Sequence, residues 1–246
     1  MSGPLRTPRG VFITGTDTGV GKTIVTAVVA SAFTAHGVNA GIMKPITTGV
    51  AENSTGLSDP DWLVSAMGVT DPPDLVAPYR FPTPAAPLVA AASMGQHIDL
   101  KRILDAFQTL STRHDCVVVE GIGGVMVPLT PDLLVVDLVQ RMGLPVLVVA
   151  RASLGSINHT LLTLECLRNR GVTICGLIFN HPFPSSASTD ESNTVPTILQ
   201  LSGLRSFGEL PHCEGLPRSW QQHRGALIGR LDVEGLLEEL GLRELA

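Results

Sequence analysis

The sequence has no long apolar run and no cluster of basic residues. No stretch approaches the roughly twenty apolar residues that a helix needs to cross a bilayer, and residues 1–10 lack a hydrophobic signal core. We therefore expect a cytoplasmic protein with no membrane partner. The formal net charge is -5 over 246 residues, which argues against nucleic acid as the main partner.

Cysteine and histidine are few and scattered. The four cysteines have no paired spacing typical of metal sites and lie mostly in apolar segments; they are Cys116, Cys166, Cys175 and Cys213. We predict that they are reduced packing residues. The seven histidines are dispersed as well, so a zinc site is not expected.

Lysine is the rarest basic residue. Only three of the seventeen lysines and arginines are lysines, at Lys22, Lys44 and Lys101. Arginine can carry surface charge, but a compact ammonium fits among phosphates where a planar guanidinium does not. Lys22 lies in a glycine-rich loop and Lys44 ends an apolar segment, so both are candidates for chemistry. A solvated surface position is the alternative for Lys44 and our prediction for Lys101.

Short apolar runs alternate with helical patterns along the chain. Strands are predicted at 11–14, 41–44, 116–120, 146–150, 174–180 and, less clearly, 206–210. Helices are predicted at 23–36, 61–67, 100–112, 133–141, 156–169, 194–201 and 233–240. Because the strands are apolar throughout, we expect one α/β domain over 1–246, a parallel sheet flanked by helices in a three-layer sandwich. Segments 71–87 and 182–193 are predicted to be long loops.

Residues 15–23, Gly-Thr-Asp-Thr-Gly-Val-Gly-Lys-Thr, join the first predicted strand to an apolar helix. This arrangement is typical of a phosphate-binding loop (P-loop), in which backbone N–H groups point at phosphate oxygens. Lys22 can reach the outer phosphates, and Thr23 can ligate magnesium. Five residues rather than the usual four separate Gly15 from Gly21, but the flanking strand and helix support the assignment. The sequence therefore predicts a P-loop NTPase-like fold that binds a nucleoside triphosphate.

A second glycine-rich turn follows the strand at 116–120, which ends in Glu120. A buried carboxylate needs a cationic partner, because an unpaired buried charge costs free energy. We expect Glu120 to bind magnesium directly or through water, and Gly121, Gly123 and Gly124 to leave room for a ligand. A strand-end glutamate that faces solvent is the alternative.

The start of the helix predicted at 61–67 offers a further carboxylate. We choose Asp61 as the metal ligand because the helical pattern fits best from this residue, and Asp59 is left as the alternative. Acidic residues commonly occupy helix caps and first turns, so a structural role is the competing interpretation for both.

Together these motifs resemble the dethiobiotin synthetases, the ATP-dependent ring-closing enzymes of biotin synthesis. The resemblance covers most of the chain. The matching motifs are 15–23, Lys44-Pro45, Thr47-Thr48-Gly49, Pro78-Tyr79-x-Phe81 with Pro84 and Pro87, Val119-Glu120-Gly121-x-Gly123-Gly124, Leu154-Gly155-x-Ile157-Asn158-His159, Asn180 and Gly208-Glu209-Leu210-Pro211. The family implies a parallel sheet with a P-loop, and a homodimer with active sites near the subunit interface.

The resemblance also implies a reaction of 7,8-diaminononanoate, carbon dioxide (or bicarbonate) and ATP with Mg²⁺. A carbamate forms on one amine, its oxygen attacks the γ-phosphate, and the second amine closes the ureido ring and expels phosphate. The products are dethiobiotin, ADP and phosphate. Two anions must meet in this reaction, so positioning and charge neutralisation should dominate catalysis.

Residue roles follow by the same resemblance. Lys22 and Lys44 are the implied catalytic residues, and Thr23, Asp61 and Glu120 are the implied metal ligands. The implied nucleotide-binding residues are Thr18, Gly19, Val20, Gly21, Lys22, Thr23, Ile24, Asp61, Glu120, Gly121, Ile122, Gly123, Asn180, His181, Leu210, Pro211 and His212.

The implied substrate site uses Thr48 beside the diamine or carbamate, with Gly155 and Asn158 receiving the substrate carboxylate from the neighbouring subunit. A helix N-terminus suits such an anion, although a helix-capping role is an equal alternative for Asn158.

The chain departs from the family pattern at two positions. Ile122 stands where alanine is frequent, and His181 follows Asn180 where an acidic residue is frequent, which puts nucleotide preference in doubt more than reaction type. A nucleotide-switching ATPase of the partitioning or nitrogenase-reductase type is the alternative function. Such proteins usually carry an additional lysine early in the P-loop, and the loop before Gly21 has none.

Overall fold

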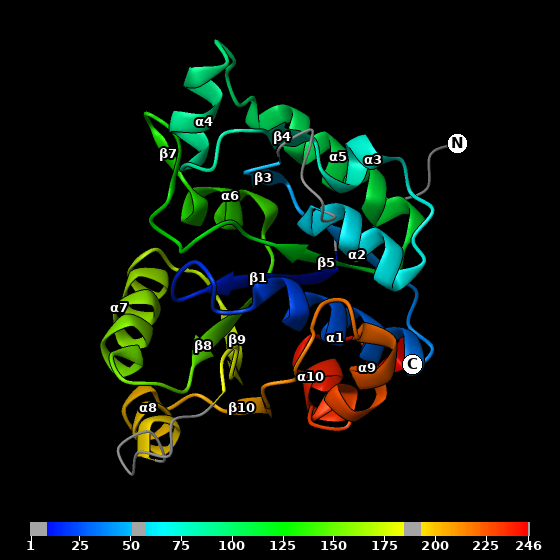
Figure 1. Ribbon diagram of the computed structural model, residues 1–246, viewed down its shortest axis with the longest axis vertical. Coiled ribbons are helices and arrows are strands. Elements are labelled where there is room, and N and C mark those ends of the chain that lie inside the picture. Colours follow the sequence, from blue (N-terminus) through cyan, green and yellow to red (C-terminus); the bar gives the residue numbers. More distant parts are fainter. Residues whose placement is uncertain (1–8, 51–57, 185–192, 246) are drawn as a thin grey trace.

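A parallel sheet lies at the centre of the computed structural model, which describes residues 9–50, 58–184 and 193–245; in these residues the sheet has six strands (Figure 1). Their order is β10-β9-β8-β1-β5-β2, and each pair of neighbours is parallel. The strands are β1 (Gly10–Gly15), β2 (Ala40–Met43), β5 (Cys116–Glu120), β8 (Val146–Arg151), β9 (Ile174–Asn180) and β10 (Ser206–Leu210). All six predicted strands are present, so the predicted parallel α/β fold is confirmed.

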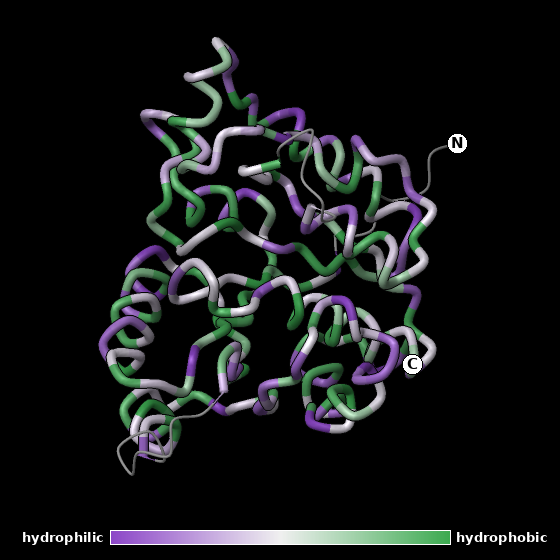
Figure 2. Tube along the Cα trace, in the orientation of Figure 1, coloured by the Kyte–Doolittle hydropathy of each residue, from purple (hydrophilic) through white to green (hydrophobic). Residues whose placement is uncertain are grey.

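Helices cover both faces of this sheet because successive strand residues point to opposite sides. Val11 and Ile13 pack on one side, with helices α1 (Lys22–Ala35), α2 (Asp59–Met67), α9 (Trp220–Ile228) and α10 (Val233–Glu239). Phe12 packs on the other side, with α4 (Pro87–Ser93), α5 (Leu100–Arg113), α6 (Val135–Met142), α7 (Ser156–Asn169) and α8 (Thr194–Ser202). The outer helices carry both hydrophobic and hydrophilic residues, as expected for helices between a core and solvent (Figure 2).

The proline-rich segment 71–87 is not the long loop that we predicted. It contains the short helix α3 (Pro73–Val76) and strand β4 (Tyr79–Phe81), which pairs with β3 (Ile46–Thr48) in a separate two-stranded sheet. Proline breaks helix interiors but is tolerated in the first helical turn, where its missing N–H has no partner to lose. Prolines occupy this turn in α2, α3 and α4. The composition alone therefore misled the prediction.

Other boundaries differ by small amounts. The helix predicted at 133–141 starts as strand β7 (Leu133–Leu134), which pairs with β6 (Pro128–Thr130), and becomes helical only from Val135. Helix α9 and a 3₁₀ helix at Arg243–Leu245 were not predicted. The loop predicted at 182–193 falls partly outside the described residues.

Two tryptophans join helix α2 to helix α9. Trp62 donates from Nε1 to the carbonyl of Pro217 at 3.2 Å, and Trp220 donates from Nε1 to the carbonyl of Ala66 at 3.3 Å. Their rings meet edge to face with centroids 5.6 Å apart. This contact fixes α2, the helix that begins with Asp59, against the C-terminal part of the chain.

The cysteines are free, as predicted. Burial raises the pKa of the Cys116 and Cys175 thiols to about 12, so both stay protonated at neutral pH and pack as small apolar residues. Within the described part of the chain, no helix combines the length and the apolar character needed to cross a membrane.

The strand register brings the candidate site together at one edge of the sheet. Ile13 of β1 lies opposite Glu120 of β5, and Met43 of β2 lies opposite Val119. The P-loop after β1, Lys44 after β2 and the end of β5 therefore meet at the carboxyl edge. Ligands bind at this edge in open α/β sheets, next to the point where the strand order reverses.

Candidate active site

The P-loop follows β1 and ends at the N-terminus of α1. Gly19 and Gly21 have φ values of +73° and +93°, a left-handed conformation that favours glycine, and Gly21 is the N-cap of α1. A Cβ atom on Gly21 would lie 2.1 Å from Nδ2 of Asn180, so no larger residue fits there without a rearrangement. The loop thus presents backbone N–H groups and a helix N-terminus to one point, an arrangement suited to phosphate.

Lys22 is almost completely buried beside this loop, with 7% of its surface exposed. Its ammonium donates to the carbonyl oxygen of Asp17 at 2.9 Å, and no carboxylate in the described residues forms an ion pair with it. Burial lowers the pKa of Lys22 to about 8, and the charge of Glu120 only partly offsets this effect. Lys22 is therefore a buried cation with no ion-pair partner among the described residues.

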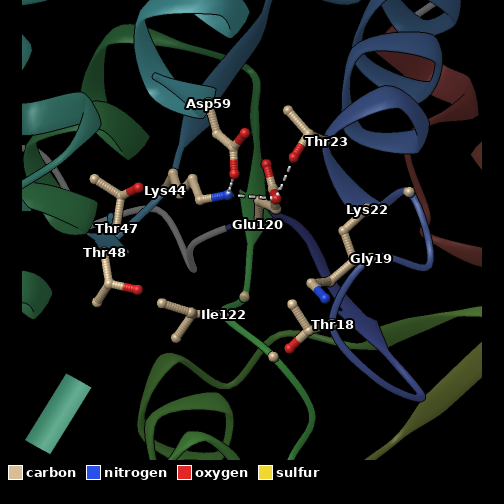
Figure 3. A pocket seen from close by; sticks show the side chains of 13 residues that line it. Thr18, Gly19, Lys22, Thr23, Lys44, Thr47, Thr48, Asp59, Glu120 and Ile122 are labelled. Carbon is tan, nitrogen blue, oxygen red and sulfur yellow. Dashed lines mark hydrogen bonds and ion pairs between the residues drawn. The ribbon is translucent and has the colours of Figure 1, made fainter. Parts of the chain in front are cut away.

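Lys44 lies on the other side of the site and is equally buried, with 4% exposed. Its backbone N–H donates to the carbonyl of Val76 at 2.7 Å, which fixes the chain where β2 ends. Its ammonium lies 2.5 Å from Oδ2 of Asp59 and 2.7 Å from Oε1 of Glu120 (Figure 3). Burial opposes charge on Lys44, but the carboxylates of Glu120 and Asp59 outweigh it and raise the pKa. The surface position considered for Lys44 is therefore wrong.

Glu120 is 1% exposed and links the two sides of the site. Its Oε1 accepts hydrogen bonds from the Lys44 ammonium and from Oγ1 of Thr23, the latter at 2.8 Å. Its Oε2 is buried and has no hydrogen-bond partner among the described residues. One carboxylate oxygen is thus held in place, and the other has no hydrogen-bond partner among the described residues. The alternative of a solvent-facing glutamate is excluded.

Asp59, and not Asp61, faces this cluster. Helix α2 begins two residues earlier than predicted, with Pro60 in its first turn, so Asp59 points at Lys44. Asp61 instead accepts from Nη1 of Arg80 at 2.7 Å and from the hydroxyl of Ser58. Burial would raise the pKa of Asp61, but the bonds from Ser58 and Arg80 outweigh it and lower the pKa. The structure places Asp59, and not our choice Asp61, in the cavity lining, so Asp59 is the better-placed candidate for a metal ligand.

The residues that could hold a divalent cation are Thr23, Asp59 and Glu120. Among the described residues no group of three or more histidine, cysteine, aspartate or glutamate side chains forms a metal site of its own. Two carboxylates and a hydroxyl beside a phosphate loop nevertheless match magnesium, which typically takes one or two carboxylates and completes its shell with phosphate oxygens and water. The unpartnered Oε2 of Glu120 is consistent with such a ligand.

A cavity of about 310 Å³ lies between the two lysines. Most of the predicted P-loop, lysine and glycine-turn residues line it, together with Thr47 and Asp59, which the prediction did not choose. The lining residues are Thr18, Gly19, Gly21, Lys22, Thr23, Lys44, Thr47, Thr48, Asp59, Glu120, Gly121, Ile122 and Gly123. Val20 is fully buried and Ile24 packs against the core, so their side chains support the loop from behind.

The remaining implied nucleotide-binding residues, from Asn180 and His181 to Leu210, Pro211 and His212, lie outside this cavity, at the ends of β9 and β10. Asn180 pairs with Leu210 in register, and its Nδ2 donates to the carbonyl of Val20 at 2.9 Å. Nε2 of His181 lies 2.6 Å from Oε1 of Glu209, and Nδ1 of His212 lies 3.2 Å from the carbonyl of Pro182. Asn180 thus connects this edge directly to the P-loop.

Gly155 and Asn158 also lie away from the cavity lining. Gly155, with φ +85°, is the N-cap of α7, and no side chain caps this helix. The capping role considered for Asn158 is therefore wrong. Asn158 is exposed near the helix N-terminus, and Leu154 before it is 90% exposed.

The fold and the site define a P-loop nucleotide-binding protein of the parallel α/β type. A family described as AAA domain matches residues 9–219. MinD, a cell division protein of Aquifex aeolicus, superposes with a TM-score of 0.56 over 95% of this chain and 97% of that chain, at 14% identity, which supports the fold alone.

Two curated relatives specify the family. The ATP-dependent dethiobiotin synthetase BioD of Thermodesulfovibrio yellowstonii is 39% identical over 93% of this chain and 98% of its own length. The protein of the same name from Anaeromyxobacter sp. (strain Fw109-5) is 40% identical, over 91% and 99%. This chain belongs to the ATP-dependent dethiobiotin synthetase family, as the sequence motifs predicted.

Proposed function

We propose that this chain is an ATP-dependent dethiobiotin synthetase that joins carbon dioxide to 7,8-diaminononanoate and closes the ureido ring, with ATP converted to ADP and phosphate. The observation that carries the proposal is the pair of buried lysines, Lys22 and Lys44, on opposite sides of one cavity beside a P-loop. A nucleotide-switching ATPase would need Lys22 to bind phosphate, but that function does not account for Lys44, nor for Thr47 and Thr48 beside it.

The chemistry requires the approach of two anions, a carbamate and a triphosphate. Lys22, near the loop, is suited to the outer phosphates because it has no carboxylate partner to give up. Lys44 is suited to the point where carbamate oxygen and γ-phosphate meet, because it lies across the cavity from the loop. Preorganised cations of this kind lower the barrier without reorganisation during the reaction. Thr47 and Thr48 offer hydroxyls to the diamine or carbamate.

Magnesium fits the residues Thr23, Asp59 and Glu120, and the family's ATP dependence suggests that they hold it. When bound, the ion would neutralise charge on the β- and γ-phosphates. Glu120 is kept in position for this role by β5 and by the Thr23 hydroxyl.

A homodimer is part of the proposal. Apolar side chains are exposed around α7, where Leu162 is 61% and Met126 is 57% exposed, and Cys166, one helical turn after Leu162, contacts Met126 at 3.3 Å. Exposed apolar clusters of this kind commonly mark protein contacts. In the proposed dimer, Gly155 and Asn158 at the N-terminus of α7 would bind the substrate carboxylate of the neighbouring active site, since a helix N-terminus suits an anion.

Leu162→Glu tests this surface, because a charge in an apolar interface disfavours association. Sedimentation velocity should report monomers for Leu162→Glu and dimers for the matched variant Leu201→Glu, which changes an equally exposed leucine on α8 (59%). A dimer that survives the first change would refute this interface.

The cytoplasmic location expected from the sequence agrees with the use of ATP, and we retain it as part of the proposal. We likewise infer a single domain, because both core clusters pack on one sheet.

The direct test supplies diaminononanoate, bicarbonate, magnesium and ATP, and measures dethiobiotin by mass spectrometry. We expect dethiobiotin and phosphate in equal amounts, with phosphate release that depends on the diamine. Rapid phosphate release without the diamine, and no dethiobiotin, would instead favour a nucleotide-switching ATPase.

A further inference from the structure

Two of the three candidate magnesium ligands, Asp59 and Glu120, contact one positive charge of the protein itself, and the third, Thr23, bonds to Glu120. The Lys44 ammonium contacts Oδ2 of Asp59 at 2.5 Å and Oε1 of Glu120 at 2.7 Å, and the same Oε1 accepts from Thr23 at 2.8 Å. Figure 3 shows Lys44 between the two carboxylates. Lys44 thus uses two of the oxygens that a divalent cation would need.

The buried carboxylate of Glu120 requires a cation beside it both with and without a bound nucleotide. Its side chain is fully buried, and a buried carboxylate without a positive partner is strongly destabilising. Lys22 does not fill this role, because its hydrogen bond goes to the carbonyl of Asp17. Of the two buried lysines, only Lys44 forms an ion pair with Glu120.

The Lys44 ammonium and a divalent cation cannot both bind the carboxylate oxygens of Asp59 and Glu120 without repelling each other. At separations of about 4 Å, like charges in a partly buried site repel by several times the thermal energy. Asp59 is the more mobile partner, because its side chain is 56% exposed, whereas Glu120 is fixed inside β5. Lys44 is held through its backbone N–H to Val76, so only its flexible side chain needs to move.

We propose that the Lys44 ammonium takes the place of the metal in the nucleotide-free protein, where it holds Asp59 and Glu120 in position. The divalent cation that arrives with the nucleotide then displaces this ammonium toward the outer phosphate. This inference rests on the proposed function, since it uses the same metal site. Lys44 thereby gains a positioning role in the free protein. Its ammonium moves to the phosphate only when the metal binds. The free protein should therefore bind divalent cations poorly by itself.

The first experiment measures Mn²⁺ binding to the nucleotide-free full chain by electron paramagnetic resonance of the unbound ion. We expect Lys44→Met to bind Mn²⁺ on the order of tenfold more tightly than the wild type, because the competing charge is gone. Lys101→Met is the matched control, since Lys101 forms an exposed pair with Asp105 at 2.5 Å, and it should bind as the wild type does. The gain should vanish in Lys44→Met combined with Glu120→Gln.

Equal or weaker Mn²⁺ binding by Lys44→Met would overturn the proposal. That outcome would leave the proposed function intact if the wild type still forms dethiobiotin, so the two failures are distinguishable.

A second experiment uses the wild-type chain, in case Lys44→Met does not fold. Lysine-selective isotope labelling gives only three side-chain signals, because the chain has only Lys22, Lys44 and Lys101. Addition of Mg²⁺ to the protein already saturated with ADP should shift the Lys44 signal and leave the Lys101 signal unchanged. A Lys44 signal that does not move when Mg²⁺ binds would also overturn the proposal.

Discussion

The P-loop and the β2–β5 edge each hold one buried lysine on the cavity, but the two ammonium groups have different partners. Lys22 bonds to a neutral carbonyl, and burial lowers its pKa to about 8. Lys44 bonds to two carboxylates, which raise its pKa despite a similar degree of burial. The contrast shows that burial alone does not decide the direction in which the pKa of a lysine shifts.

This difference suggests a division of labour. A cation without an anionic partner gains an ion pair when phosphate binds, so Lys22 should contribute mainly to nucleotide affinity. Lys44 must exchange partners before it can meet a new anion, so it should contribute mainly to the chemical step. Replacement of each lysine in turn tests these two roles directly.

Lys44→Ala should have the largest effect. We expect dethiobiotin formation to fall about 10²–10³-fold, the usual cost of one lost group that stabilises transition-state charge, with nucleotide affinity within a few-fold of the wild type. Mass spectrometry measures the product, and isothermal titration calorimetry measures the affinity. Lys101→Ala is the control. A loss of affinity as large as the loss of turnover would contradict the division.

Lys22→Met should have the opposite signature. Nucleotide affinity should fall about 100-fold, because a charge-assisted contact to phosphate is lost inside a buried site. Calorimetry with ADP and a non-hydrolysable ATP analogue checks this result. Unchanged affinity would mean that the backbone of the loop carries binding alone.

Asp59→Asn and Asp61→Asn test two carboxylates within one helix turn of α2. Asp59→Asn should raise the magnesium concentration needed for half-maximal activity about tenfold, because one ligand charge is removed. Asp61→Asn should leave this concentration unchanged, because Asp61 pairs with Arg80. A magnesium titration of both variants decides the assignment, and equal effects would return Asp61 to the site.

A change of pH should have the smallest effect. As pH rises through about 8, Lys22 of the free protein loses its proton, so nucleotide affinity should drop roughly fourfold between pH 7 and 8.5. The free energy of unfolding should change in the opposite direction. An unfolded lysine titrates near 10.5, so between pH 8 and 10.5 the unfolded chain binds more protons than the folded chain. The contribution of Lys22 to the free energy of unfolding therefore rises with pH in this range. Lys22→Met should abolish the slope of affinity with pH.

The sequence predicted the central sheet and the phosphate loop because both depend on local signals. Continuous apolar runs identify buried parallel strands, and a glycine-rich turn between strand and helix identifies the loop. Glu120 was also predictable, since three valines before a carboxylate indicate a buried charge.

The identity of the second carboxylate was harder to predict. The choice between Asp59 and Asp61 depends on where α2 begins, and a proline between them suggested a later start. The ion pairs of Asp61 with Arg80 and of Lys44 with Asp59 join separate segments of the chain, and no local pattern reveals them. The small β3–β4 sheet escaped prediction for the same reason, because its pairing joins strands about thirty residues apart.

The contact between Trp62 and Trp220 gives this molecule an intrinsic optical reporter. They are the only two tryptophans of the chain, and Trp62 lies one turn along the helix that starts with Asp59. Any displacement of that helix alters the surroundings of both indoles. The fluorescence emission of the unlabelled protein therefore offers a direct view of how the acidic end of α2 responds as its ligands arrive.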